Sequence, residues 1–238
     1  RLDEAEASYT KAIALKPDFA EVHYNLGNIL KELGRLDEAE ASYTQAIALK
    51  PDYAEAHYNL GITLNELGRL NEAEASYMQA IVLKPDFAEA YSNLGNSLQE
   101  LGRLGEAEAS YRQAIALKPD YVEAYSNLGN SLKELGRLGE AEASYVQAIA
   151  LKPDYAEAHN NLGATLLELG KLDESEASYT QAIALKPNYA EAHYNLGVTL
   201  NELGKLNEAE VSYTHAIVLK PDYAEAHNSL LRCLYLLD

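Results

Sequence analysis

The sequence of 238 residues is poor in several residue types on which common functions depend. It has no tryptophan and a single cysteine, Cys233, so no disulfide can form within the chain and no thiol pair is present for redox or metal chemistry. Basic residues are also scarce, because 19 Lys and Arg stand against 37 Asp and Glu, and they form no cluster. The net charge of -18 repels a phosphate backbone, so nucleic acid is not an expected partner.

Long hydrophobic runs are missing as well. No stretch reaches the roughly 18 consecutive apolar residues that a membrane-spanning helix needs, and no charged segment followed by an apolar one opens the chain. We therefore expect no membrane partner and a cytoplasmic location. The first residues, Arg1 to Ala5, reproduce Arg35 to Ala39, so we expect the chain to be cut from a longer protein in which a targeting signal can lie elsewhere.

Proline is the strongest positive signal, because each of the seven prolines lies 34 residues from the next: Pro17, Pro51, Pro85, Pro119, Pro153, Pro187 and Pro221. A fixed period of this length indicates a stack of one repeated unit, which presents a long surface and favours binding over chemistry. We expect a single domain, residues 1–238. It consists of a half repeat at 1–19, full repeats at 20–53, 54–87, 88–121, 122–155, 156–189 and 190–223, and a terminal helix at 224–238.

Each repeat is predicted to hold two helices. In the first full repeat, helix A covers Ala20–Leu33 and stops at Gly34, where glycine adopts a left-handed cap at the lowest cost. Helix B begins near Asp37, which with Glu40 fits the capping pattern, and it ends before Pro51. Such short connections make neighbouring helices antiparallel.

Further capping residues and glycines follow the same scheme. Asp52 with Glu55 is expected to cap the next helix A, and Gly105 and Gly139 stand where Asp caps other copies of helix B. Glycine at the eighth position of helix A, with small residues on helix B, lets the two helices approach closely beside Tyr43 and its equivalents. These glycines are Gly27, Gly61, Gly95, Gly129, Gly163 and Gly197.

The repeat resembles the tetratricopeptide repeat over the whole chain. The signature positions of that family are occupied by Leu26, Gly27, Ala39, Tyr43, Ala46 and Pro51 and by their equivalents in six full copies. The resemblance implies an all-α fold: an α-solenoid that forms a right-handed superhelix of antiparallel helix pairs, with helix A on the concave side. The chain departs from the family where His23 and its equivalents replace an aromatic residue, and where Ser175 replaces a small alanine.

Comparison of the copies with one another indicates a binding surface. Helix A varies at its positions 5, 9 and 12, which share one helical face. In the family that this chain resembles, the face looks into the groove. The candidate peptide-binding residues on this face are Tyr24, Tyr58 and Tyr194 at position 5, Asn28, Asn96 and Asn130 at position 9, and Lys31 and Lys133 at position 12.

Position 6, in contrast, is asparagine in every full copy: Asn25, Asn59, Asn93, Asn127, Asn161 and Asn195. An amide both donates and accepts, so this asparagine column is suited to hold the backbone of an extended peptide. It resembles the asparagine ladder in the repeat arm of O-linked N-acetylglucosamine transferases. The alternative interpretation is that these side chains bond only along the array.

Acidic residues shape the expected ligand. Position 13 of helix A is always glutamate, at Glu32, Glu66, Glu100, Glu134, Glu168 and Glu202. An acidic tail is therefore an improbable ligand, and we expect an extended protein segment that is neutral to basic.

No catalytic group, metal site or cofactor is predicted. His23, His57, His159, His193 and His227 share position 4, so they lie one repeat apart, too far to hold one metal, and are interpreted as half-buried packing residues. His215 is interpreted as a solvated surface residue. Acidic pairs such as Glu38 and Glu40 recur in every unit and are attributed to capping and to the helix dipole.

The ends suggest self-association. The segment 224–238 is apolar and carries Leu231 in place of the glycine that admits helix B. Its 15 residues and the 19 residues before the first full repeat make 34, one period, so head-to-tail stacking is possible.

Three functions follow from these patterns. The leading hypothesis is a non-enzymatic scaffold that binds an extended peptide or protein segment in its concave groove. The alternatives are a substrate-recognition arm of a larger enzyme, such as a glycosyltransferase, and a self-assembling structural array.

Overall fold

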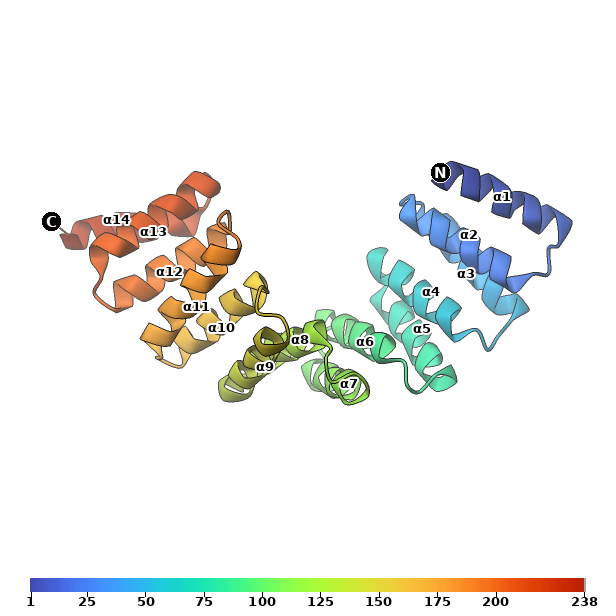
Figure 1. The fold of residues 1–238 in the computed structure, drawn as a ribbon, viewed down its shortest axis with the longest axis horizontal. Helices are drawn as coiled ribbons and strands as arrows, with labels where there is room; N and C mark the ends of the chain where they lie inside the picture. Colours follow the sequence, from blue (N-terminus) through green and yellow to red (C-terminus); the bar gives the residue numbers. More distant parts are fainter. Residues whose placement is uncertain (238) are drawn as a thin grey trace. The chain divides into compact units, whose positions relative to one another are not determined.

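The computed structural model describes residues 1–237 and divides into two compact units, Arg1–Pro119 and Asp120–Asp238. The part described holds fourteen helices and no strand (Figure 1). Unit 1 contains α1 (Leu2–Leu15), α2 (Ala20–Glu32), α3 (Leu36–Leu49), α4 (Ala54–Glu66), α5 (Leu70–Leu83), α6 (Ala88–Glu100) and α7 (Leu104–Leu117). Unit 2 contains α8 (Val122–Glu134), α9 (Leu138–Leu151), α10 (Ala156–Glu168), α11 (Leu172–Leu185), α12 (Ala190–Glu202), α13 (Leu206–Leu219) and α14 (Ala224–Leu237).

The even-numbered helices are the predicted helices A and the odd-numbered ones the predicted helices B. Helix A ends as expected, since Gly34 has a φ of 73° in the left-handed region and the five equivalent glycines share this conformation. Helix B ends one residue before Lys50, and Pro51 follows. The fold is therefore the all-α solenoid of helix pairs that the sequence predicts. None of the helices, in the part described, is long and apolar enough to cross a membrane.

The prediction of the N-terminal caps is wrong. Helix α3 begins at Leu36 after Arg35, without a side-chain cap, and Asp37 lies inside its first turn. Helix α4 likewise begins after Tyr53 and not at Asp52. The carboxylates of the first turn still face the positive end of the helix dipole, which explains why acidic residues recur there.

Two glycines that the sequence places at caps lie inside helices instead. Gly105 and Gly139 are the second residues of α7 and α9 and replace no cap.

The acidic residues of helix B also have another role than capping. Arg69 donates to Glu72 of its own repeat and to Glu40 of the preceding repeat, both at 2.6 Å. The Arg69 guanidinium holds the pKa of Glu72 below its usual range. The bridge recurs between Arg35 and Glu6, Arg103 and Glu74, Lys171 and Glu142, and Lys205 and Glu176. These exposed pairs contribute little stability each, but they set the register between neighbouring repeats.

The core of each repeat is the contact between the eighth residue of helix A and a tyrosine of helix B. A Cβ atom placed on Gly27 would lie 2.7 Å from Cε1 of Tyr43, so only glycine fits there. Tyr43 and its small neighbours Ala39 and Ala46 are fully buried. Replacement of one such alanine by Ser175 is accommodated, because its hydroxyl donates to the carbonyl of Gly163 at 2.9 Å.

Within each unit the helices A are also direct neighbours of one another. Contacts join α2 to α4 and α4 to α6 in unit 1, and α8 to α10, α10 to α12 and α12 to α14 in unit 2. In contrast, no such contact joins two helices B within the described part of either unit. The helices A therefore form a continuous surface in each unit, and the candidate residues lie on it.

Candidate functional site

The asparagine column forms hydrogen bonds between successive repeats in unit 1. The Nδ2 group of Asn59 donates to the Tyr24 hydroxyl at 3.0 Å and to Oδ1 of Asn28 at 2.9 Å. Nδ2 of Asn93 donates to the Tyr58 hydroxyl at 3.0 Å. The amide nitrogen of the column thus links each helix A to the one before it.

The column in unit 2 follows the same arrangement with other acceptors. Nδ2 of Asn161 donates to Oδ1 of Asn130 at 3.1 Å, and Nδ2 of Asn195 donates to Oδ1 of Asn160 at 3.4 Å. Asn127 occupies the same position of α8 and is half-buried.

The amide oxygens of the column are the part left for a ligand. Oδ1 of Asn59, Asn93 and Asn195 has no partner among the described residues, and the side chain of Asn25 makes no hydrogen bond within them. All six column members are half-buried, so they reach the surface of helix A. The column therefore presents acceptors suited to backbone N–H groups of an extended chain.

The tyrosines at position 5 pack against neighbouring aromatic rings. Tyr24 packs between Tyr43 and Tyr53, with ring centroids 6.0 and 4.9 Å apart. Tyr58 and Tyr194 make equivalent contacts with the aromatic residue that precedes the next helix A, at 4.6 and 5.0 Å. These rings are half-buried packing elements whose edges reach the surface.

The smaller residues at position 5 are buried. Ser92, Ser126 and Asn160 are only 2–3% exposed. In these three repeats, therefore, the side chain at position 5 is buried and adds almost nothing to the accessible surface of helix A. Position 5 varies there with the packing of the neighbouring aromatic residues.

Position 9 has a role that the sequence did not reveal. The buried hydroxyl of Tyr43 donates to Oδ1 of Asn28 at 2.8 Å, and Tyr145 donates to Asn130 at 2.7 Å. Tyr111 likewise donates to Asn96. Burial raises the pKa of the Tyr43 and Tyr145 phenols, so both stay protonated as donors. The signal that was missed is the pairing of Asn at position 9 with a tyrosine fifteen residues later.

The residues at position 12 are half-buried and include the two lysines of the candidate set. Lys31 makes no ion pair within the described residues, and Lys133 pairs with Glu168 of the next repeat at 3.1 Å. Asn65 donates to the buried hydroxyl of Ser97 at 3.0 Å.

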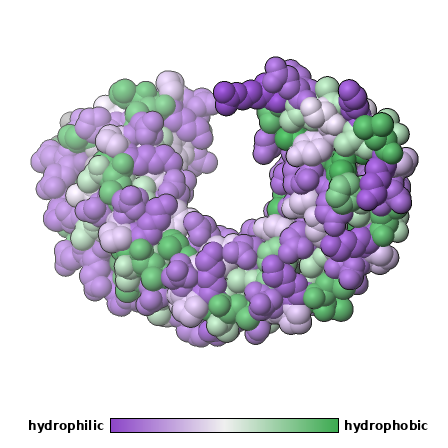
Figure 2. All heavy atoms as spheres, turned by 45° about the vertical axis from the view of Figure 1, so that its right-hand side comes forward, coloured by the Kyte–Doolittle hydropathy of each residue, from purple (hydrophilic) through white to green (hydrophobic). Residues whose placement is uncertain are grey.

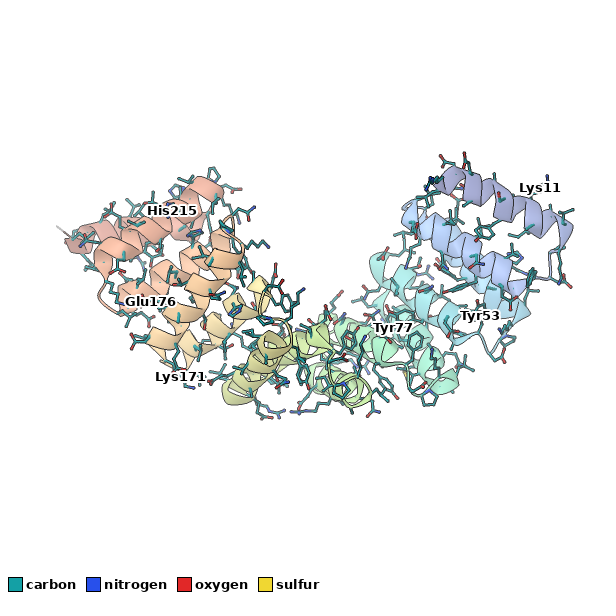
Figure 3. The ribbon with its side chains drawn as sticks, in the orientation of Figure 1. Lys11, Tyr53, Tyr77, Lys171, Glu176 and His215 are labelled. Atoms are coloured by element: carbon teal, nitrogen blue, oxygen red, sulfur yellow. The ribbon has the colours of Figure 1, made fainter. Side chains whose placement is uncertain are left out.

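A shallow depression in unit 1 brings the variable positions and the column together. It has a volume of about 160 Å³. The residues around it come from α4, α5 and α6: Ile62, Asn65, Glu66, Tyr77, Asn93 and Asn96. Tyr77, labelled in Figure 3, comes from the helix B between the two helices A. The depression therefore combines an apolar wall with amide and carboxylate groups, as a side-chain pocket requires.

The charge around this depression is negative. Glu32, Glu66 and Glu100 are exposed and have no ion-pair partner within the described residues. The bridging arginines described above, together with lysines such as Lys84, which pairs with Glu55 at 3.3 Å, form ion pairs elsewhere. Figure 2 shows a largely hydrophilic surface with hydrophobic residues in separate small groups. Polar and electrostatic contacts thus dominate what this face offers.

The histidines at position 4 are packing residues, with one exception. His23, His57, His159 and His193 are half-buried, and each Nε2–H donates to the carbonyl of the proline six residues earlier at 2.9–3.2 Å. His227 makes the same bond at 3.0 Å but is exposed, which corrects the prediction for this residue. No three His, Cys, Asp or Glu side chains in residues 1–237 converge to hold a metal ion.

Cys233 is equally unsuited to nucleophilic chemistry. It is 1% exposed, and its thiol donates to the carbonyl of Leu206 at 3.3 Å. Burial raises the pKa of this thiol, which lowers the fraction of reactive thiolate.

The last helix exposes an apolar face. Leu231 and Tyr235 are 68% and 84% exposed, and with Arg232 and Leu236 they line a depression of about 360 Å³. This face of α14 corresponds to the side that receives helix B in the other repeats, because Leu231 occupies the position of Gly197.

The repeated helix pairs and their glycine–tyrosine contacts define a tetratricopeptide-repeat protein. The family model described as the cilia and flagella-associated protein 70 C-terminal domain matches residues 1–193, and the tetratricopeptide repeat model matches residues 190–223. Because the first of these models covers more than half of the sequence, the chain belongs to this family of tetratricopeptide-repeat domains. The predicted identity of the repeat is confirmed.

Solved structures of the same class resemble the chain over most of its length. YrrB, described as a TPR protein with an unusual peptide-binding site, is 26% identical with a TM-score of 0.67 and covers 79% of this chain and 96% of its own. MamA is 27% identical with a TM-score of 0.65 and covers 70% and 97%. The pilF protein of Pseudomonas aeruginosa has a TM-score of 0.77 over 97% and 99% at 17% identity, which concerns the fold alone. No protein with a curated description matches this sequence.

Proposed function

We propose that this chain is a protein-interaction scaffold whose helices A bind an extended, neutral to basic peptide segment. The observation that carries this proposal is the depression in unit 1, where a column asparagine, three variable positions and an unpaired glutamate meet. Protein-interaction scaffolds are the common role of the family to which the chain belongs. The description of YrrB as a peptide-binding protein supports the same use of the fold here.

The proposed recognition has two parts. The amide oxygens of the asparagine column accept backbone N–H groups, which holds the peptide without reading its sequence. The variable residues Ile62 and Asn65, with Glu66, select one side chain, preferably apolar with a basic end. The chemistry of this face requires no catalytic residue, and we propose no enzymatic activity for the chain. If it serves as the recognition arm of a larger enzyme, the same face selects the substrate.

Binding is expected to depend on Asn93 through its amide oxygen. In a fluorescence-anisotropy screen of lysine-containing, neutral and acidic peptides, we expect lysine-containing peptides to bind best and Asn93→Ala to weaken binding by roughly tenfold, the loss of about one hydrogen bond. Tyr58→Phe is the matched control, because it removes the hydroxyl that Asn93 bonds but leaves the amide oxygen in place. Equal losses in both variants would show that the column serves only the packing of repeats.

The charge preference is tested separately. We expect Glu66→Gln to weaken the binding of lysine-containing peptides more than the binding of neutral ones. Asp37→Asn removes the same charge from helix B and should leave the binding of both kinds of peptide unchanged. Preferential binding of acidic peptides would contradict the proposal.

The exposed apolar face of α14 is the surface on which the suggested head-to-tail stacking would take place. Stacking in the register of the repeats would set α1 of a second copy against α14, with Tyr9 facing Leu231. At the equivalent glycines a Cβ atom already lies 2.6–2.9 Å from the tyrosine ring. We therefore propose that Leu231 prevents this stacking.

Leu231→Gly is accordingly expected to create head-to-tail oligomers. Sedimentation velocity should show a monomer for the parent chain and concentration-dependent larger species for the variant, because the stacking is heterologous and does not close. Leu236→Gly, on the same apolar surface, serves as the control. A monomeric Leu231→Gly variant at high concentration would refute the proposed block.

A further inference from the structure

Two histidines meet on the last full repeat, and no other repeat within residues 1–237 has such a pair. His193 of α12 and His215 of α13 have ring centroids 5.4 Å apart with an interplanar angle of 53°. His215 is labelled on α13 in Figure 3. The other copies carry a different residue at the position of His215: Lys11, Gln45, Gln79, Gln113, Gln147 and Gln181. His215 is exposed, as expected, and its contact with His193 is not visible in the sequence.

The hydrogen bond of His193 determines which nitrogen is available. Its Nε2 lies 3.1 Å from the carbonyl oxygen of Pro187, and a carbonyl oxygen only accepts, so Nε2 carries the proton. Nδ1 of the neutral ring then keeps its lone pair. A backbone carbonyl that holds one ring nitrogen in this way is the usual support of a metal-binding histidine. His193 is thus held in one tautomer before any ion binds.

The separation of the rings fits a shared ion. Two imidazoles that bind one tetrahedral ion through nitrogens about 2 Å from it have their centroids about 5 Å apart. The observed centroid separation of 5.4 Å is close to this value. His215 is exposed and can rotate to direct either nitrogen at the ion.

The charge of the chain and the chemistry of the ligands determine which ions the pair would bind. The net charge of -18 raises the local concentration of cations around the chain. Imidazole nitrogen selects late transition metals over Mg²⁺ and Ca²⁺, which prefer oxygen ligands.

We propose that His193 and His215 together bind one divalent late transition-metal ion, such as Cu²⁺, Zn²⁺ or Ni²⁺, between α12 and α13. Two protein ligands leave the remaining positions to water or to a group from another molecule. The site joins helices A and B of one repeat, so an ion in it also stabilises that pair.

Calorimetric titration of the tag-free chain with Zn²⁺, Ni²⁺ and Cu²⁺ tests the site. We expect one ion per chain, with Cu²⁺ bound most tightly and excess Mg²⁺ without effect. His215→Gln restores the residue of the other repeats and should weaken binding about tenfold or more, because one of two protein ligands is lost. Absence of binding in the parent chain, or unchanged affinity in His215→Gln, would overturn the proposal.

A second variant tests the geometry by building the site again. Gln181→His places a histidine opposite His159, whose Nε2 is held by Pro153 at 3.0 Å in the same way, and should raise the stoichiometry to two ions. Gln147→His is the matched control, because Tyr125 stands at the position of His159 in that repeat. Equal gains in both variants, or no gain in Gln181→His, would show that the histidine pair is not the cause.

Discussion

Gly129→Ala is expected to destabilise unit 2 by about 1–3 kcal/mol, the usual cost of overpacking a core. A Cβ atom on Gly129 would lie 2.6 Å from Cε1 and 2.8 Å from Cζ of Tyr145. The ring cannot retreat, because Tyr145 is fully buried and its hydroxyl is bonded to Asn130. The clash therefore outweighs the gain of up to about 1 kcal/mol that alanine brings to a helix interior. Urea unfolding gives the change in free energy.

Gly139→Ala is the matched control in the same unit. A Cβ atom at Gly139, in the first turn of α9, meets nothing within 4 Å. The same substitution should therefore be neutral or stabilise by up to about 1 kcal/mol, because alanine restricts the unfolded chain. If both variants change stability in the same direction, the glycine–tyrosine contact does not decide the packing of the pair.

Removal of the Tyr179 hydroxyl is expected to stabilise the protein, whereas the same change at Tyr145 destabilises it. The Tyr145 hydroxyl donates to Asn130, so Tyr145→Phe should cost about 0.5–1.5 kcal/mol. The Tyr179 hydroxyl is buried and has no hydrogen-bond partner among residues 1–237, because Ala164 stands where Asn130 stands in the preceding repeat. Tyr179→Phe removes a desolvation penalty of about 1–3 kcal/mol.

Ala164→Asn tests the cause of this difference. The new amide oxygen would lie beside the Tyr179 hydroxyl, as the oxygen of Asn130 lies beside that of Tyr145 in the preceding repeat. The substitution should therefore stabilise the protein by about 0.5–1.5 kcal/mol when residue 179 is tyrosine, and should not stabilise the Tyr179→Phe variant. Urea unfolding of the four proteins gives the coupling free energy. A coupling near zero, or a destabilising Tyr179→Phe, would contradict the assignment.

The repeat and its two helices were predictable because their signals are local. The period of the prolines, the left-handed turn at Gly34 and the leucine spacing of helix A each depend on a few consecutive residues. The close approach at Gly27 was predictable as well, because the family signature pairs it with Tyr43. The N-terminal caps failed, because Asp37 fits a cap as well as a first-turn position and sequence alone does not distinguish the two.

The candidate site was predictable only in part, since its contacts join different repeats. The sequence indicates the asparagine column but not that its amide nitrogens bond to the preceding repeat, as Asn59 does to Tyr24. It also does not show that variation at Ser92 reflects burial. The pair of His193 and His215 lies 22 residues apart on two helices, and no spacing rule links them.

The sequence by itself determined the architecture, because every repeat carries the same turn, glycine and tyrosine, and each needs only its neighbours to bury its apolar face. Only the tertiary structure decided which polar groups remain for a ligand. Whether a polar atom of a side chain such as Asn59 is available to a ligand depends on the hydrogen-bonding groups of the adjacent repeat. It also depends on the distances to those groups across the helix interface.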